Sequence, residues 1–154
     1  WQGDLNVKPL SAQLVHGHDF LSKIDPYVAV TLGGNRLQSG IAKGMGKTPS
    51  WNDVLRFRVN NEPFMQISVF DKDRFSKDDF IGEATIQMAE VYQRRNGSNW
   101  YELKNNGKEA GKIMISYEFT PVAGGAPPGY GQPPPSYGQP PPGYGQPPQG
   151  YKPY

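Results

Sequence analysis

Six of the eight aspartates fall in two short stretches, where carboxylates this close in sequence could bind a cation. The first stretch holds Asp19 and Asp25, and the second holds Asp71, Asp73, Asp78 and Asp79. Crowded carboxylates raise one another's pKa unless a cation neutralises them. Oxygen ligands without His or Cys favour calcium or magnesium, and the flexible coordination of calcium suits mixed loops better than the strict octahedron of magnesium. The two stretches therefore predict a calcium site.

Two familiar acidic motifs fit the second stretch poorly. A helix-loop-helix calcium hand needs Gly at its sixth place and Glu at its twelfth, where this chain has Ser76 and Gly82. An aspartyl phosphotransferase of the dehalogenase type needs a parallel α/β body and normally has Thr or Val where Phe75 stands. We therefore expect neither of these sites.

Other reactive residues offer little chemistry. The chain has no cysteine, which excludes disulfides and Cys-ligated metal sites and fits a reducing compartment. We interpret His16 and His18 as surface residues of a loop, because a zinc site would need more imidazole or thiolate partners. No Ser, Cys or His has an evident base and orienter, and no glycine loop could cradle phosphate, so we expect no enzyme activity.

Apolar residues alternate with other residues through most of residues 1–119, which predicts β-strands. The loops that join such strands would carry the clustered aspartates. The alternating sets are Leu5 and Val7; Val28, Val30 and Leu32; Leu55, Phe57 and Val59; Met65, Ile67 and Val69; and Ile113, Ile115, Tyr117 and Phe119. Turn sequences at 32–35, 60–63 and 105–107 separate such segments, and only 88–95 reads as a helical turn. This pattern predicts an all-β fold, an eight-stranded antiparallel β-sandwich. A sandwich gathers alternate loops at one end, so the acidic stretches could converge there.

Composition changes sharply near residue 122. Twelve of the sixteen prolines lie at or after Pro121, whereas all seven Phe and all three Trp precede Thr120. We predict a folded domain over 1–122 and a disordered Pro/Gly/Tyr-rich tail over 123–154. The formal net charge is +2, but apart from the six clustered aspartates the domain is basic, which suggests a cationic body with an anionic pocket.

Residues 19–28, Asp-Phe-Leu-Ser-Lys-Ile-Asp-Pro-Tyr-Val, and residues 69–82, Val-Phe-Asp-Lys-Asp-Arg-Phe-Ser-Lys-Asp-Asp-Phe-Ile-Gly, closely resemble a C2 domain, the calcium-dependent phospholipid-binding sandwich. The second stretch is especially similar to that of synaptotagmin. Residues 48–53, Thr-Pro-Ser-Trp-Asn-Asp, resemble the Asn-Pro-x-Trp-Asn-Glu turn of the family. The order of segments resembles the circularly permuted second topology of these domains.

The resemblance implies a complete set of calcium ligands. The five carboxylates of the family match Asp19, Asp25, Asp71, Asp73 and Asp79. Ser76 matches a place that often adds an oxygen ligand, and the carbonyls of Phe20 and Lys72 match backbone ligands. Asp78 matches no usual ligand place and is interpreted as a local negative field.

The resemblance also implies binding to anionic phospholipid, because the bound ions keep open coordination places that lipid phosphates fill. Phe20, Leu21 and Phe75 are expected to enter the membrane interface, and Arg74 and Lys77 to pair with headgroups. No apolar run approaches the roughly 20 residues of a membrane helix. We therefore expect a cytoplasmic protein that moves with calcium to the inner face of the plasma membrane or to another anionic membrane.

A second basic surface is predicted from Lys43, Lys47, Arg56 and Arg58. The last two alternate with buried Leu55 and Phe57 on a strand. This surface is either a solvated polar face or a phosphoinositide site like that of some relatives. Nucleic acid is not expected, because these basic residues lack interleaved stacking aromatics.

The tail repeats a seven-residue unit from Pro127 onward. Its Pro-Pro-x-Tyr sequences end at Tyr130, Tyr137 and Tyr144 and resemble ligands of WW domains, which grip prolines and a tyrosine. A spacing arm and tyrosine-driven self-association are the alternatives. Similar tails accompany single C2 domains of plants and protists. The predicted function is therefore a calcium-triggered membrane adaptor, and the alternative is a constitutive protein-interaction scaffold in which calcium and lipid are incidental.

Overall fold

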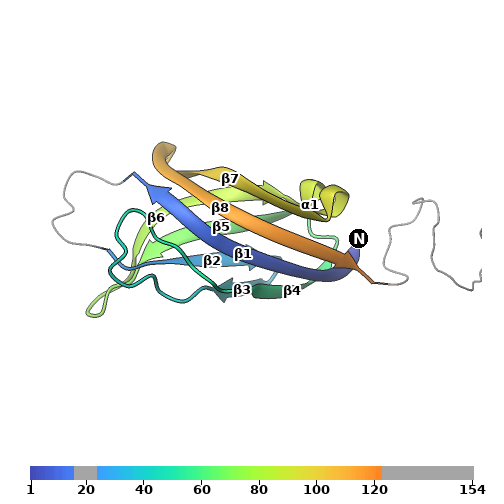
Figure 1. Cartoon of the computed structure of the whole chain (residues 1–154), viewed down its shortest axis with the longest axis horizontal. Coiled ribbons are helices and arrows are strands. Elements are labelled where there is room, and N and C mark those ends of the chain that lie inside the picture. Colours follow the sequence, from blue (N-terminus) through green and yellow to red (C-terminus); the bar gives the residue numbers. More distant parts are fainter. Residues whose placement is uncertain (16–23, 123–154) are drawn as a thin grey trace, which may run out of the picture. The chain divides into compact units, whose positions relative to one another are not determined.

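The computed structural model describes residues 1–15 and 24–122. The chain separates into two units, Trp1–Val122 and Ala123–Tyr154, and the second lies outside the described residues. Within this unit, the described residues form eight strands and one short helix (Figure 1). In chain order they are β1 (Gln2–Leu14), β2 (Pro26–Leu32), β3 (Asn35–Gln38), β4 (Leu55–Asn60), β5 (Phe64–Asp71), β6 (Asp79–Gln87), α1 (Met88–Arg94), β7 (Asn96–Asn105) and β8 (Lys108–Pro121).

The strands form two packed antiparallel layers, β4-β1-β8-β7 and β6-β5-β2-β3. The continuous order through all eight strands depends on β6 and β7, which share the single pair Glu83 and Lys104. The expected β-sandwich is thereby confirmed. Strand β1 pairs with β8 and runs directly toward the first acidic stretch, which is the arrangement that the permuted topology predicts.

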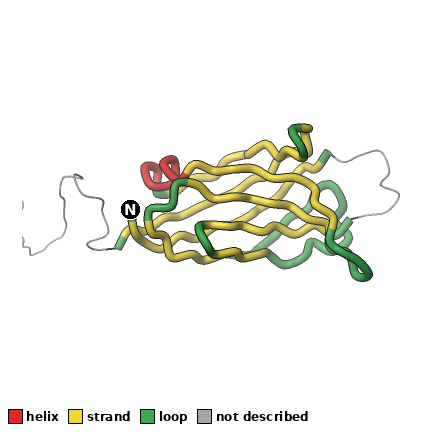
Figure 2. Tube along the Cα trace, turned by 180° about the vertical axis from the view of Figure 1, so that it is seen from behind, coloured by secondary structure: helices red, strands yellow, loops and turns green. Residues whose placement is uncertain are grey.

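The core lies between the layers, because alternate strand residues point inward and are buried. Leu5 and Val7 of β1 and Val28 and Val30 of β2 have no exposed surface. The turns expected at 32–35, 60–63 and 105–107 join β2 to β3, β4 to β5 and β7 to β8. Figure 2 shows the long connections gathered at one end of the layers. No helix of the described part is long and apolar enough to cross a membrane.

Candidate functional site

Three strand ends bring acidic residues together. Asp71 is the last residue of β5, and its backbone pairs with Pro26 at the start of β2 on one side and with Asp79 at the start of β6 on the other. Asp25 directly precedes β2. Because neighbouring strands lie about 4.8 Å apart, this register places Asp25, Asp71 and Asp79 in one small region. The predicted convergence of these three aspartates is thus observed, with Asp71 in the middle.

Hydrogen bonds donated by backbone amides hold this region together. The amide of Asp25 donates to Oδ1 of Asp71 at 3.0 Å, and the amide of Lys72 donates to the carbonyl of Asp25 at 3.0 Å. The amide of Gly44 donates to Oδ1 of Asp25 at 2.6 Å. Asp25 therefore links two connections, which we call the second loop (39–54, between β3 and β4) and the third loop (72–78, between β5 and β6). The first loop is 15–25.

The central carboxylate is destabilised as an anion. Burial raises the pKa of Asp71 most, and the nearby charges of Asp25, Asp79 and Asp73 raise it further, although the hydrogen bond from the Asp25 amide acts the other way. A cation at this place would relieve both the like-charge repulsion and the desolvation cost. The donor set consists of hard oxygens, which fits calcium.

The third loop is shaped by its own carboxylates. Oδ1 of Asp73 accepts the Phe75 amide at 2.9 Å, and Oδ2 accepts the Ser76 hydroxyl at 2.8 Å. These hydrogen bonds lower the pKa of Asp73. Asp73 therefore stabilises the turn in this conformation.

Asp78 does more than supply the local negative field that the sequence suggested. Its Oδ1 accepts the Asp73 amide at 2.9 Å, and its Oδ2 accepts the hydroxyl of Tyr27 on β2. The ammonium of Lys72 lies 3.8 Å from Oδ2. The pKa of Asp78 is lowered first by the Asp73 amide and then by the Tyr27 hydroxyl. Asp78 thus fastens the third loop to β2, a contact that sequence spacing could not reveal because 51 positions separate the two residues.

Within residues 1–15 and 24–122, no three His, Cys, Asp or Glu side chains are grouped closely enough to hold a metal ion. Two further facts bear on the predicted ligands. Asp25 and Asp73 use oxygens to accept backbone amides, and the predicted ligands Asp19 and Phe20 lie outside the described residues. Leu21, His16 and His18 also lie outside them. Calcium coordination by the whole predicted set therefore stays a prediction.

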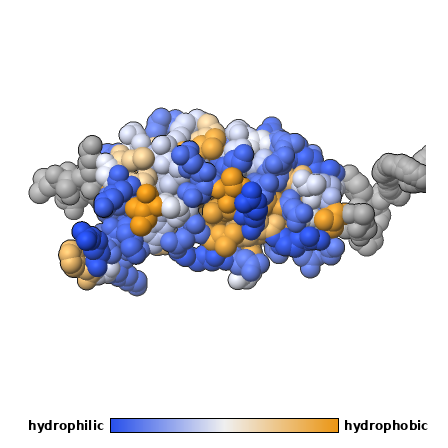
Figure 3. Space-filling model, turned by 60° about the horizontal axis from the view of Figure 1, so that its bottom comes forward, coloured by the Kyte–Doolittle hydropathy of each residue, from blue (hydrophilic) through white to orange (hydrophobic). Residues whose placement is uncertain are grey.

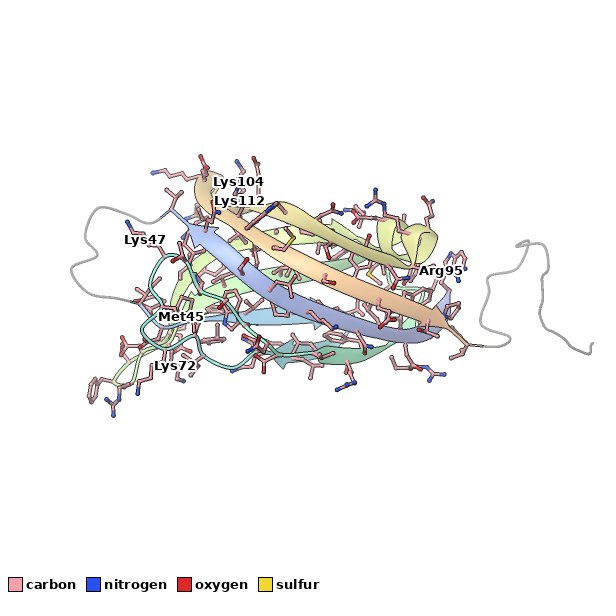
Figure 4. All side chains as sticks on the ribbon, in the orientation of Figure 1. Met45, Lys47, Lys72, Arg95, Lys104 and Lys112 are labelled. Carbon is pink, nitrogen blue, oxygen red and sulfur yellow. The ribbon has the colours of Figure 1, made fainter. Side chains whose placement is uncertain are left out.

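The third loop presents its tip to solvent. Phe75 is 92% exposed, and the Arg74 guanidinium carbon lies 5.9 Å from its ring centroid. Lys77 is also exposed. Figure 4 shows this loop, which begins at Lys72, projecting from one end of the layers. An apolar side chain between two cations is the composition expected of a surface that contacts anionic lipid.

Comparison with known proteins decides the family. The family model described as "C2 domain" matches residues 3–103. The chain belongs to the C2 domain family. Proteins of this family generally bind phospholipid in a calcium-dependent manner.

Small plant C2 proteins are among its relatives. The chain is 33% identical to "Elicitor-responsive protein 1" of Oryza sativa subsp. japonica, covering 79% of this chain and 86% of that one. It is 35% identical to "16 kDa phloem protein 2" of Arabidopsis thaliana, covering 77% and 82%. Neither name denotes an enzyme, which agrees with the expectation that this chain has no enzyme activity.

Solved structures agree. A C2 domain-containing protein from an elicitor-responsive gene superposes with a TM-score of 0.70 at 33% identity, covering 80% of this chain and 92% of that one. A calcium-bound structure of two C2 domains of Extended-Synaptotagmin 2 gives a TM-score of 0.65 at 30% identity, covering 76% and 45%.

The predicted second basic surface is divided in this C2 domain. Lys47 is in the second loop, where its carbonyl accepts the amide of Leu14, whereas Arg56 pairs with Asn6 on β1. Eight residues of strand separate these contacts, or roughly 26 Å at about 3.3 Å per residue. Lys43 is next to Gly44, which bonds Asp25, and Arg58 forms an ion pair with Asp4 at 3.2 Å. Lys43 and Lys47 thus belong to the acidic end, whereas Arg56 and Arg58 lie on β4. The four residues predicted to form one phosphoinositide site are therefore not clustered.

Proposed function

We propose that this C2 domain binds anionic phospholipid membranes when calcium fills its acidic end. The observation that carries the proposal is the meeting of Asp25, Asp71 and Asp79 at three adjacent strand ends, next to the exposed Phe75. Asp19 and Asp73 would complete the carboxylate set. Ser76 and the carbonyls of Phe20 and Lys72 would add oxygens.

Electrostatics supplies the switch. Without a cation, the acidic end should be repelled by an anionic bilayer, and neutralising it lets the surrounding cations dominate. Calcium, when bound, also offers coordination places to lipid phosphates. Arg74 and Lys77 would each add roughly 1 kcal/mol near a charged surface. Phe20, Leu21 and Phe75 would enter the interface. We place the protein in the cytoplasm, moving to an anionic membrane with calcium.

Sedimentation with vesicles tests the proposal. Phosphatidylcholine vesicles containing phosphatidylserine should pellet most of the full chain in calcium and little of it in chelator, because only the neutralised acidic end is attracted. Vesicles of phosphatidylcholine alone are the control for surface charge. Equal pelleting in calcium and chelator would rule out the switch. Titration calorimetry without lipid that shows no heat with millimolar calcium would favour the scaffold alternative instead.

The tail would recruit a partner at the membrane. Three Pro-Pro-x-Tyr sequences fit WW-like aromatic grooves, and several weak copies on one chain raise avidity. Replacing Tyr130, Tyr137 and Tyr144 together by Ala should remove binding to an immobilised WW domain while leaving vesicle sedimentation unchanged. Retention of this variant equal to that of the unmodified chain would refute tyrosine-dependent recruitment.

A further inference from the structure

The second loop carries two large apolar side chains that the core does not use. Ile41 is 45% exposed and Met45 is 46% exposed. Two cations, Lys43 and Lys47, accompany them on the same loop and are exposed as well. Exposed apolar residues interleaved with lysines form a surface that is apolar and cationic at once, although the sequence alone assigned only the lysines a function.

The loop holds these side chains in a defined conformation. Gly44 and Gly46, with φ of +70° and +66°, flank Met45 and adopt the left-handed backbone that glycine tolerates best. The amide of Met45 donates to the carbonyl of Ala42 at 3.2 Å, and Ala42 itself is buried. Met45 Sδ accepts the amide of Ser50 at 3.4 Å. The exposure of Met45 is therefore built into the loop.

Hydrogen bonds connect this surface to the acidic end. Gly44 donates to the side chain of Asp25, and Gly46 donates to the carbonyl of Ile24 at 3.1 Å. Asp25 in turn bonds Asp71 and Lys72 at the root of the third loop. Met45, Lys47 and Lys72 lie at the same end in Figure 4, far from Arg95. The second and third loops therefore stand on either side of the acidic strand ends.

Apolar groups elsewhere are differently placed. Figure 3 shows apolar residues as separate spots among hydrophilic ones on the side that it presents. Phe64 is 50% exposed at the start of β5, seven residues from Asp71 at its other end, or roughly 23 Å along the strand. Unlike Phe64, the side chains of Ile41 and Met45 share their loop with Lys43 and Lys47. Hydrogen bonds also connect that loop to the acidic end.

We propose that the second loop is a membrane-contact element in its own right. Ile41 and Met45 enter the interface of an anionic bilayer on one side of the acidic end while Phe75 enters on the other, and Lys43 and Lys47 contact lipid phosphates. This inference rests on the proposed function and adds the second loop to the apolar membrane contacts proposed there. An interfacial site gains from buried apolar area together with attraction to anionic lipid.

The absence of cysteine from the chain allows a direct test. A Met45→Cys variant labelled with an environment-sensitive fluorophore should shift to the blue when phosphatidylserine-containing vesicles and calcium are added. A Phe64→Cys variant labelled in the same way is the matched control and should not shift. A shift at both positions, or at neither while the protein pellets, would overturn the inference.

A second variant measures the contribution of the loop. Ile41→Ser with Met45→Ser should weaken calcium-dependent partitioning into these vesicles by about tenfold, because two partly exposed side chains lose their transfer from water. Phe64→Ser should change it by less than about twofold. Equal partitioning of the loop variant and the unmodified chain would refute this inference alone. An unmodified chain that fails to pellet in calcium would refute the proposed function and the inference with it.

Discussion

Replacing Asp71 and Asp73 together by Asn should abolish calcium-dependent sedimentation with anionic vesicles. Asp71 lies between β2 and β6 at the centre of the acidic end, and Asp73 belongs to the third loop that rises from it. The substitution removes two of the five predicted carboxylates, so calcium loses both charge and coordinating oxygens. We expect a loss of calcium-dependent pelleting of at least about tenfold, since each removed charge contact is worth roughly 1 kcal/mol or more.

The same variant should fold. An Asn at position 71 still offers Oδ1 to the amide of Asp25, and it no longer repels Asp25 and Asp79. Its calcium-free melting temperature should therefore not fall far below that of the unmodified chain, as circular dichroism would show. A matched control is Asp4→Asn with Glu102→Gln, which removes two negative charges from exposed ion pairs outside the three loops. Undiminished calcium-dependent pelleting of the Asp71 and Asp73 variant would contradict the site assignment.

Local patterns in the sequence predicted the strands and turns well because they depend on near neighbours. Burial alternates along β4, and the turn at Gly33 has the positive φ of +60° that a hairpin glycine allows. Strand β7 is harder to predict from sequence, since its less exposed positions include Gly97 and Asn99 and only Leu103 of the strand is fully buried. Its antiparallel pairing with β8, rather than an apolar pattern of its own, defines it as a strand.

Features that depend on distant contacts could not be read from spacing. The bond from Tyr27 to Asp78 joins β2 to the third loop, so the role of Asp78 emerges only when the strands are paired. The path of the second loop likewise separates Lys43 from Arg56, although both were assigned to one basic surface. The sequence alone therefore located the acidic stretches, whereas the contacts that support them and the apolar surface of the second loop could be found only from the fold.

Substituting Gly111 by Ala should destabilise the domain strongly. Gly111 has φ of +119° and pairs with Leu14, the last residue of β1 before the first loop. A Cβ here would overlap the carbonyl oxygen of Gln13 and lie 2.8 Å from the Cα of Leu14. The left-handed conformation costs roughly 1–2 kcal/mol, and overpacking against rigid backbone adds roughly 1–3 kcal/mol. A loss of about 2–5 kcal/mol would lower the melting temperature by roughly 10 °C or more.

Gly107→Ala separates these two costs. Gly107 also has a positive φ, +79°, but a Cβ there would meet nothing within 4 Å. This control should therefore lose only the conformational cost, roughly 1–2 kcal/mol. Urea unfolding of both variants measures the difference. Similar stability of the two variants would show that β1 can move away from β8, and the start of the first loop would then not be fixed by this close backbone contact.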